Sequence, residues 1–369
     1  MVSHSCISGN ASSTSNVDFF ADPTPDMSPF TALVGPEGRF LQALNASNIS
    51  YKVVVNNFQS VIDREWVANT RQSGKVGFDY DNKYNTYEDI TTELKRIGSA
   101  GGKAKYGSVG KSYEGREIPY LTITKPGGTN KKTIFFECGI HAREWVAVAA
   151  CLWVTNQLVT TTTYDNLLDK YEFIIVPTLN PDGYVYTHTV NRKWRKTRSK
   201  SGLCFGADPN RNWDAAFCET GASTDPCDDK YCGKSAFSEP ETKAMSELIA
   251  TKASNTAGYF SIHCFGQLFM YPWGHKAGNP PNYAQLDKLA YLGVNAIKAT
   301  NNVTYTPDVA SGCATDYVYD KLKIQMAFAI ELRPDRSHPD GFILDPKFIK
   351  PVSTEAWNGL RAVIENLDK

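Results

Sequence analysis

The sequence carries no excess charge, because 39 Lys and Arg residues balance 39 Asp and Glu residues in a chain of 369. Without a net charge there is no overall field to attract nucleic acid or an anionic membrane, so neither is expected as a partner. No apolar run approaches the ~18 residues that would span a bilayer. The opening residues, MVSHSCISGNASSTSN, also lack the apolar stretch of a secretory signal peptide.

Cysteine, by contrast, occurs nine times, and six of the nine stand in two tight groups. These are Cys138 with Cys151, and Cys204, Cys218, Cys227 and Cys232. Many pairings are possible, and a structural zinc at the second group is disfavoured because it has no CxxC pair or adjacent histidine. Sequons at Asn10, Asn45, Asn48 and Asn302 agree with the cysteines in favouring a secreted, disulfide-bearing protein, although no signal peptide is evident.

Composition separates an N-terminal region from the rest. Residues 1–30 are rich in Ser, Asn, Asp and Pro and are predicted to be disordered or atypical. Residues 40–66 show the pattern of a helix, a strand and a helix. A polar, basic segment follows, in which Arg71 and Lys75 are expected to be exposed. It is either a solvated linker or a cleavage site for a trypsin-like protease.

From about residue 85 the pattern alternates between strands and helices. Short apolar runs predict strands at 118–125, 131–140, 171–180, 258–266 and 326–333. Helical spacing occurs at 86–97, 143–159, 240–253, 283–300 and 354–367. Ser238 and Glu241 have the spacing of a capping box, with Pro240 in the first turn. Strands that are apolar on both faces and alternate with helices predict an α/β sheet covered on both sides.

Two of the six histidines follow predicted strands directly. His141, in CGIHAREW, comes just after KKTIFFE with Glu144 three residues later, and His263 closes the run FSIH. Chemistry in such sheets gathers at the carboxyl ends of strands. One strand-end histidine is usually structural, but two with a carboxylate, and a water in the fourth place, are the pattern of a catalytic zinc.

Glu331 ends the apolar run MAFAIE, where a carboxylate is costly unless it is used or paired. It is either a salt-bridge partner of Arg333 or a general base beside the zinc.

Arginines near the predicted strand ends indicate a substrate with a free carboxylate. NRKWRKTR supplies Arg192, Arg195 and Arg198, and DPNRNW supplies Arg211. Such basic runs are usually solvated, but guanidinium groups bind carboxylates in a bidentate manner. Two or three of them near zinc would bind a terminal carboxylate and a developing oxyanion.

Six motifs, in order, carry a family resemblance: CGIHAREW, PTLNPDGY, WRKTR, DPNRNWD, SIHCFGQLFMYPWG and IELRPD. From roughly residue 78 to residue 369 the chain resembles the pancreatic-type, A/B group of zinc metallocarboxypeptidases. The resemblance implies a mixed twisted sheet, one zinc ion per chain, a monomer, and an exopeptidase that removes C-terminal residues from peptides and proteins.

The resemblance also implies roles for single residues. Zinc would be held by His141, Glu144 and His263, with Glu331 as general base and Asp208 orienting His141.

For the substrate, the resemblance implies that Arg195 donates to the oxyanion. Asn210 and Arg211 would clamp the terminal carboxylate, and Arg143 would be a secondary contact. The cysteine positions resemble the B-type pattern, which implies the disulfides Cys138–Cys151, Cys204–Cys227 and Cys218–Cys232.

Residues 31–71 are similar to the C-terminal half of the family's inhibitory propeptide, and residues 72–369 to its catalytic domain. This similarity favours a zymogen activated by tryptic cleavage near Arg71. The usual first strand and helix of the propeptide have no counterpart in residues 1–30, which leaves inhibition open.

The stretch Val303–Tyr317 departs most from the family. It is shorter than the usual loop and lacks the mobile tyrosine that closes over the substrate, unless Tyr305 takes that part. The family's selecting residue corresponds to Thr315, whose neutral side chain favours A-type cleavage after apolar or aromatic residues. A shift of one residue would place Asp316 in the pocket and favour Lys or Arg.

Cys264 and Cys313 replace a serine and a glycine that are usual in the family. Buried free thiols are the ordinary interpretation, and a fourth disulfide between them is a hypothesis; the state of Cys6 is open.

Two other functions stay open. A non-catalytic protein that keeps zinc and binds C-termini would fit the shortened loop. A different zinc acyl hydrolase, such as a deacylase, is disfavoured by the arginine clamp.

Overall fold

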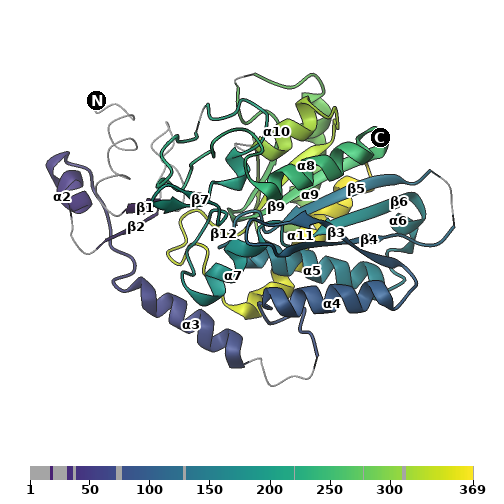
Figure 1. Cartoon of the computed structure of the whole chain (residues 1–369), viewed down its shortest axis with the longest axis horizontal. Coiled ribbons are helices and arrows are strands. Elements are labelled where there is room, and N and C mark those ends of the chain that lie inside the picture. The colour runs from purple at the N-terminus through teal and green to yellow at the C-terminus, as the bar shows by residue number, and fades with distance from the viewer. Residues whose placement is uncertain are drawn as a thin grey trace.

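The structure, a computed structural model, describes residues 17–19, 31–35, 39–71, 77–127, 130–219, 221–276, 278–309 and 313–368. Its centre is an eight-stranded mixed sheet with the strand order β11-β10-β12-β9-β5-β6-β4-β3 (Figure 1). The central strands β12, β9, β5 and β6 are parallel, and β10, β4 and β3 each run antiparallel to a neighbour. The strands are β3 (Ala104–Lys111), β4 (Glu117–Ile123), β5 (Lys132–Cys138), β6 (Tyr171–Val176), β9 (Thr256–Gly266), β10 (Leu268–Tyr271), β11 (Thr306–Val309) and β12 (Ala327–Asp335).

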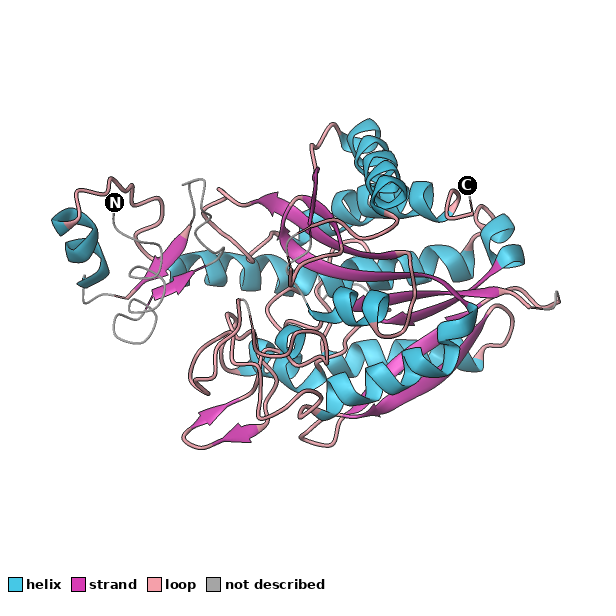
Figure 2. Ribbon diagram, turned by 90° about the horizontal axis from the view of Figure 1, so that it is seen from above, coloured by secondary structure: helices cyan, strands magenta, loops and turns pink. Residues whose placement is uncertain are grey.

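Helices lie on both faces of this twisted sheet, as the alternating pattern predicted (Figures 1 and 2). Helix α11 packs on α5 and α9, while α8 contacts β3 and α10 contacts β9 and β12. The helices are α4 (Tyr87–Ser99), α5 (Trp145–Thr160), α6 (Asp165–Lys170), α7 (Pro181–Thr189), α8 (Pro240–Lys252), α9 (Tyr283–Asn301), α10 (Cys313–Asp320) and α11 (Ile349–Ile364). Helix α5 is buried over most of its surface because it packs between the sheet and α11, which explains its apolar sequence.

The N-terminal part consists of β1 (Val17–Phe19), β2 (Ala32–Val34), α2 (Arg39–Ala46) and α3 (Phe58–Arg71). β1 pairs antiparallel with β2, so the predicted disorder of residues 1–30 is wrong for residues 17–19; the other residues of that segment lie outside the described ones. The strand predicted between α2 and α3 is also wrong. Residues 51–57 form neither helix nor strand, and Val53 and Val54 are each 54% exposed, because no strand among the described residues pairs with them.

Two features of the helices differ from the sequence-based expectation. Helix α7, in a segment with no predicted helix, begins with Pro181 after Asn180, whose side chain accepts a hydrogen bond from the Gly183 amide. The capping box predicted at Ser238 and Glu241 does not form. Helix α8 does begin at Pro240, but Glu241 Oε1 accepts the amide of Tyr113 instead, at 3.0 Å.

Helix α3 lies at the edge of the molecule (Figure 1), and buried polar contacts join it to residues that follow it in the chain. The Glu65 carboxylate accepts two hydrogen bonds from Arg192, at 2.6 and 3.0 Å, and one from the Leu344 amide at 3.3 Å. The Asn69 side chain exchanges two hydrogen bonds with the backbone of Tyr84, at 2.7 and 3.0 Å. Arg71 is the exposed last residue of the helix, while residues 72–76, with Lys75, lie outside the described residues.

Three disulfides join Cys138 to Cys151, Cys204 to Cys227, and Cys218 to Cys232. These are the pairs that the family resemblance implies. The second disulfide joins β8 (Cys204–Phe205), which pairs with β7 (Lys200–Ser201), to Cys227, and the third joins two loop residues. In the part of the chain that the structure describes, no helix has both the length and the apolar character to cross a membrane.

Candidate metal centre and active site

The sheet brings the predicted metal ligands together at the carboxyl ends of its central strands. Parallel pairing of β9 with β12 aligns His263 with Glu331, and pairing of β5 with β9 aligns Cys138 with Ile262. His141 follows β5 after a short turn, and Glu144 immediately precedes α5. Residues that are 122 positions apart in the sequence thereby become neighbours.

His141, Glu144 and His263 form a buried group that could hold a metal ion, with one ligand atom from each lying within 4.8 Å of the others. The two Nδ1 atoms are 3.2 Å apart, and they approach the Glu144 carboxylate oxygens at 2.7 and 3.1 Å. Each Nε2 points away, to Asp208 Oδ1 at 3.1 Å for His141 and to Ser261 Oγ at 2.9 Å for His263. An Nε2–H that donates outward leaves the Nδ1 lone pair directed into the group, where two lone pairs repel unless a cation lies between them.

This donor set suits zinc. Imidazole nitrogen and carboxylate oxygen are ordinary zinc ligands, and three protein ligands leave a position for water or substrate. Burial alone would lower the pKa of His263, but the carboxylates of Glu144, Glu331 and Glu137 raise it. The surroundings of the group therefore favour a cation, and the residues present fit the metal.

Glu331 lies beside this group without a cation of its own. The residue is half-buried, and its buried Oε2 has no hydrogen-bond partner within the described residues. The alternative prediction, a salt bridge with Arg333, is wrong because Arg333 pairs with Glu355 of α11. Burial raises the pKa of Glu331, which makes its carboxylate a better proton acceptor near neutral pH.

Asp208 connects His141 to Arg195. One carboxylate oxygen accepts from His141 and from the Asn210 amide, and the other accepts from Arg195 Nε and Nη2 at 3.0 and 2.7 Å. Burial alone would raise the pKa of Asp208, but Arg195 and His141 hold it well below its usual range. An ionised Asp208 fixes both the tautomer of His141 and the position of the guanidinium group.

The predicted clamp residues lie nearby in the short helix η2 (Pro209–Arg211) and are buried. Asn210 Oδ1 accepts the amide of Ala314 at 3.2 Å. Arg211 donates from Nε to the Gly221 carbonyl and from Nη1 to the Asn210 carbonyl, which leaves both hydrogens of Nη2 and one of Nη1 as further donors. Arg143 is also buried, with its guanidinium over the Phe342 ring at 4.1 Å.

The predicted convergence of the arginine run holds only in part. Arg195 reaches Asp208, whereas Arg192 binds Glu65 of α3. Arg198 stacks on the rings of Tyr186 and Trp194, at 3.8 and 4.6 Å, which places it in an aromatic cluster.

The residues predicted to set specificity are buried beside the clamp, at the start of α10. Thr315 is 2% exposed and Asp316 is 1% exposed. Both carboxylate oxygens of Asp316 accept the Gly274 amide, and Oδ2 lies 3.1 Å from His275 Nδ1. Asp316 is therefore held by its own chain.

Tyr305, the candidate for the mobile tyrosine, is buried, and its hydroxyl donates to Glu355 Oε1 at 3.4 Å. It packs in the core against α11 and is not positioned to close over a substrate. Residues 310–312 of the same segment lie outside the described part of the chain.

Cys264 is a buried free thiol, so the hypothetical disulfide to Cys313 is not formed. The Cys264 amide donates to Glu144 Oε2 at 3.2 Å, so the backbone at this position supports the metal group. Of Cys313 the structure describes only the backbone, and Cys6 lies outside the described residues.

Sequence reasoning missed two buried carboxylates, Glu65 on α3 and Glu137 near the metal group. Glu137 ends the apolar run KKTIFFE and accepts hydrogen bonds from Tyr259 and Ser261, at 3.0 and 2.8 Å. The argument that singled out Glu331, a carboxylate after a long apolar run, applies equally to Glu137 and would have found it.

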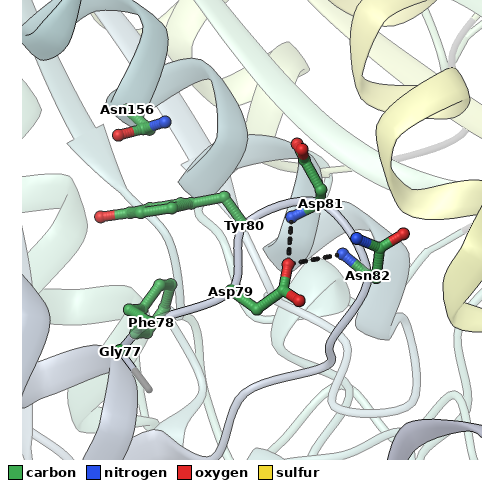
Figure 3. Close-up of a pocket in the computed structure, with 7 residues that line it drawn as sticks. All are labelled: Gly77, Phe78, Asp79, Tyr80, Asp81, Asn82 and Asn156. Atoms are coloured by element: carbon green, nitrogen blue, oxygen red, sulfur yellow. Dashed lines mark hydrogen bonds between the residues drawn. The ribbon is translucent and has the colours of Figure 1, made fainter. Parts of the chain in front are cut away.

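A separate cavity of about 290 Å³ is lined by residues 77–82 and Asn156 (Figure 3). Asp79 accepts the amides of Asp81 and Asn82, each at 2.9 Å, which closes a turn along the cavity wall. None of the lining residues belongs to the candidate metal group, so this cavity is not the active site.

The sequence matches the family model described as zinc carboxypeptidase over residues 91–359. It is similar to the relative called zinc carboxypeptidase A 1 of Drosophila melanogaster, with 38% identity over 340 residues that cover 88% of this chain and 79% of the relative. It is also similar to human carboxypeptidase B, with 36% identity over 87% of this chain and 78% of the relative.

Solved structures agree with these matches. The crystal structure of thrombin activatable fibrinolysis inhibitor has 28% identity and a TM-score of 0.87, over 98% of this chain and 95% of that one. Carboxypeptidase A from Helicoverpa armigera has 30% identity and a TM-score of 0.87, over 96% of this chain and 92% of that one.

Proposed function

Because the chain belongs to the zinc carboxypeptidase family, whose substrates are peptide C-termini, we propose that it removes apolar or aromatic C-terminal residues and is made as a zymogen. The observation that carries this proposal is the buried group His141, Glu144 and His263 with the unpaired carboxylate of Glu331 beside it.

His141 and His263, through Nδ1, and Glu144, through its carboxylate, are the residues that would hold the zinc ion. When bound, zinc polarises a carbonyl group and makes water more acidic. Asp208 would keep the Nδ1 lone pair of His141 directed inward by accepting its Nε2–H, since Asp208 Oδ1 lies 3.1 Å from His141 Nε2.

Glu331 would accept the proton of the water that attacks the scissile carbonyl and return it to the leaving amine. Its buried Oε2 and the lack of a paired cation among the described residues support this role. Arg195 would stabilise the developing oxyanion. Its bonds to Asp208 use Nε and Nη2, which leaves Nη1 to donate to the substrate.

Asn210 and Arg211 would bind the terminal carboxylate of the substrate. The Asn210 oxygen is engaged by Ala314, so its amide group can donate, and Arg211 retains Nη2. Arg143 would be a secondary contact. A terminal carboxylate held here restricts cleavage to the last peptide bond.

Preference for apolar or aromatic C-terminal residues rests on Thr315 and Asp316. Thr315 is neutral, and Asp316 already accepts the Gly274 amide and faces His275. A carboxylate engaged in this way is a poor partner for the cation of a C-terminal Lys or Arg, because that cation would compete with existing donors.

Residues 31–71 would form the propeptide and residues 72–369 the catalytic domain. The buried pair of Glu65 and Arg192 attaches α3 to the catalytic part, and Arg71 at the end of α3 is exposed to a trypsin-like protease.

The three disulfides fit an oxidising compartment, and we propose that the protein is secreted and acts as a monomer. A second candidate function, binding C-termini without turnover, is favoured by one observation: Tyr305 is held in the core by Glu355.

The test is hydrolysis of blocked dipeptides that end in Phe, Leu, Lys or Glu by the trypsin-treated protein, with and without a zinc chelator. Chelator-sensitive release of Phe and Leu is expected. Release of Lys instead would overturn the A-type preference. No release by a protein that retains about one zinc per chain would replace the enzyme with the non-catalytic binder.

A matched variant, Thr315→Asp, introduces a carboxylate at the proposed selecting position. It is expected to shift release from Phe toward Lys and Arg, whereas an unchanged preference would remove Thr315 from the specificity site.

A further inference from the structure

We propose that Ser261 and Glu137 form a hydrogen-bond relay that positions His263 for zinc. The inference rests on the proposed ligation of zinc by His263. The relay runs from His263 Nε2 to Ser261 Oγ, 2.9 Å, and from Ser261 Oγ to Glu137 Oε2, 2.8 Å. All three side chains are at most 2% exposed.

The sheet places the three residues in line. Ser261 and His263 are two positions apart on β9, so their side chains project from the same face. The pairing of β5 with β9 sets Glu137 directly opposite Ser261. The relay is therefore fixed by strand register and requires no loop to hold it.

The direction of the hydrogen bonds follows from their surroundings. His263 Nδ1 lies 3.2 Å from His141 Nδ1 and 3.1 Å from Glu144 Oε2, so a metal at this point takes the Nδ1 lone pair. The ring proton is then on Nε2 and is donated to Ser261 Oγ. A serine hydroxyl has one hydrogen, which Ser261 donates to the Glu137 carboxylate.

His141 has the same arrangement without the intermediate hydroxyl, since its Nε2 donates directly to Asp208. Each histidine is thus backed by a buried carboxylate, and a carboxylate behind a ligating imidazole fixes its tautomer and increases its basicity.

A purely structural role explains Glu137 poorly. The side chain is completely buried in a strand that is otherwise apolar beyond Thr133, and Oε1 has no partner among the described residues. Burying a carboxylate there is costly, and an apolar side chain would fill the same volume at less cost.

The experiment measures zinc affinity by competition with a chelator, together with the Tm of the metal-free protein, for wild type and four variants. Ser261→Ala removes the relay and is expected to weaken zinc binding by about 10- to 100-fold, and Glu137→Gln by about 10-fold. Ser261→Thr keeps the hydroxyl and is expected to restore the affinity.

Thr133→Val is the matched control, because Thr133 is a buried residue of β5 whose hydroxyl has no partner in the described structure. It is expected to leave zinc affinity unchanged. Wild-type affinity in Ser261→Ala would overturn the relay, and so would a lower metal-free Tm with unchanged affinity. If Ser261→Ala fails to fold, Glu137→Gln and Ser261→Thr carry the test.

Failure of the proposed function has a different result. A wild-type protein that binds no zinc refutes ligation by His263 itself. A wild-type protein that binds zinc, with relay variants that bind it equally well, refutes the relay alone.

Discussion

At the scale of single residues, some buried carboxylates of this protein have a cationic partner, and others do not. Glu65 and Glu355 pair with arginines, and Asp208 pairs with Arg195. Glu331 and Glu241 have no such partner in the described part of the chain, and each keeps one oxygen without a hydrogen bond. The uncompensated cost of burial makes these two residues informative.

Glu331→Gln is expected to lower kcat by about 100-fold or more while zinc content is retained, because the amide cannot accept a proton. The measurement is kcat on a dipeptide ending in Phe, with zinc determined by atomic absorption. Glu331→Asp, which keeps a carboxylate at a shorter reach, should retain more activity. Comparable kcat in wild type and Glu331→Gln would remove Glu331 from the proton transfer.

Glu241 predicts a pH dependence of stability. Burial raises its pKa from 4.5 to about 8, so between these values the folded protein holds a proton that the unfolded chain has lost. The contribution of Glu241 to the free energy of unfolding is therefore fully present below pH 4.5. It is lost as the pH rises toward 8, at about 1.4 kcal/mol per pKa unit.

Glu241→Gln removes this titration but keeps the acceptor for the Tyr113 amide. Its Tm is expected to match wild type near pH 4.5 and to exceed it by several degrees near pH 8.5, measured by calorimetry. A constant Tm difference across this range would contradict the argument.

At the scale of elements, β9 positions residues of the candidate site, and α3 is attached at the periphery. Strand β9 carries Ser261 and His263. It pairs with β5, which places Glu137 opposite Ser261, and with β12, which places Glu331 opposite His263. Helix α3 lies at the periphery and depends on a few polar contacts, with Glu65 in the most buried of them.

Glu65→Ala is expected to loosen α3, because removal of one partner from a buried pair leaves Arg192 uncompensated at a cost of about 3–5 kcal/mol. Tryptic cleavage after Arg71 should be at least about tenfold faster, since a helix must open locally before it can be cut. Mass spectrometry of timed digests gives the rate.

Asp63→Ala is the matched control on the same helix, because Asp63 is exposed and its carboxylate accepts a hydrogen bond from Gln59 of the same helix, at 2.9 Å. Equal rates for the two variants would mean that the buried pair does not hold α3.

At the scale of the whole molecule, the metal group joins parts of the chain that are distant in sequence. Its two Nδ1 atoms lie 3.2 Å apart, so the site is unfavourable without a cation between them. Binding of zinc to the folded state alone stabilises that state by linkage.

Removal of zinc by a chelator is expected to lower Tm by about 5–10 °C, since zinc at a thousand times its Kd contributes about 4 kcal/mol. Added zinc should restore the Tm, which calorimetry follows. His263→Ala, which lacks a ligand, should show no response to the chelator. An equal response in wild type and His263→Ala would place the effect elsewhere.

The alternating strands and helices, and the chemical groups of the candidate site, could be predicted from the amino-acid sequence. Apolar runs followed by His141, His263 and Glu331 predicted strands at these places, and the structure has β5, β9 and β12 there, although β9 and β12 continue three and four residues beyond His263 and Glu331. Short local signals were less reliable. The Ser238–Glu241 spacing predicted a cap, but Glu241 binds the Tyr113 amide, a residue 128 positions away.

The partners of these residues, in contrast, depend on the three-dimensional arrangement of the strands and helices. Strand register sets Glu331 beside His263 and Glu137 beside Ser261, and no local pattern encodes a register between distant strands. The same holds for Arg333, which pairs with Glu355 and so leaves Glu331 unpaired, and for Tyr305, which α11 holds in the core. Sequence thus gives the chemical groups and their local order, whereas pairing across the sheet gives each group its neighbours and its charge environment.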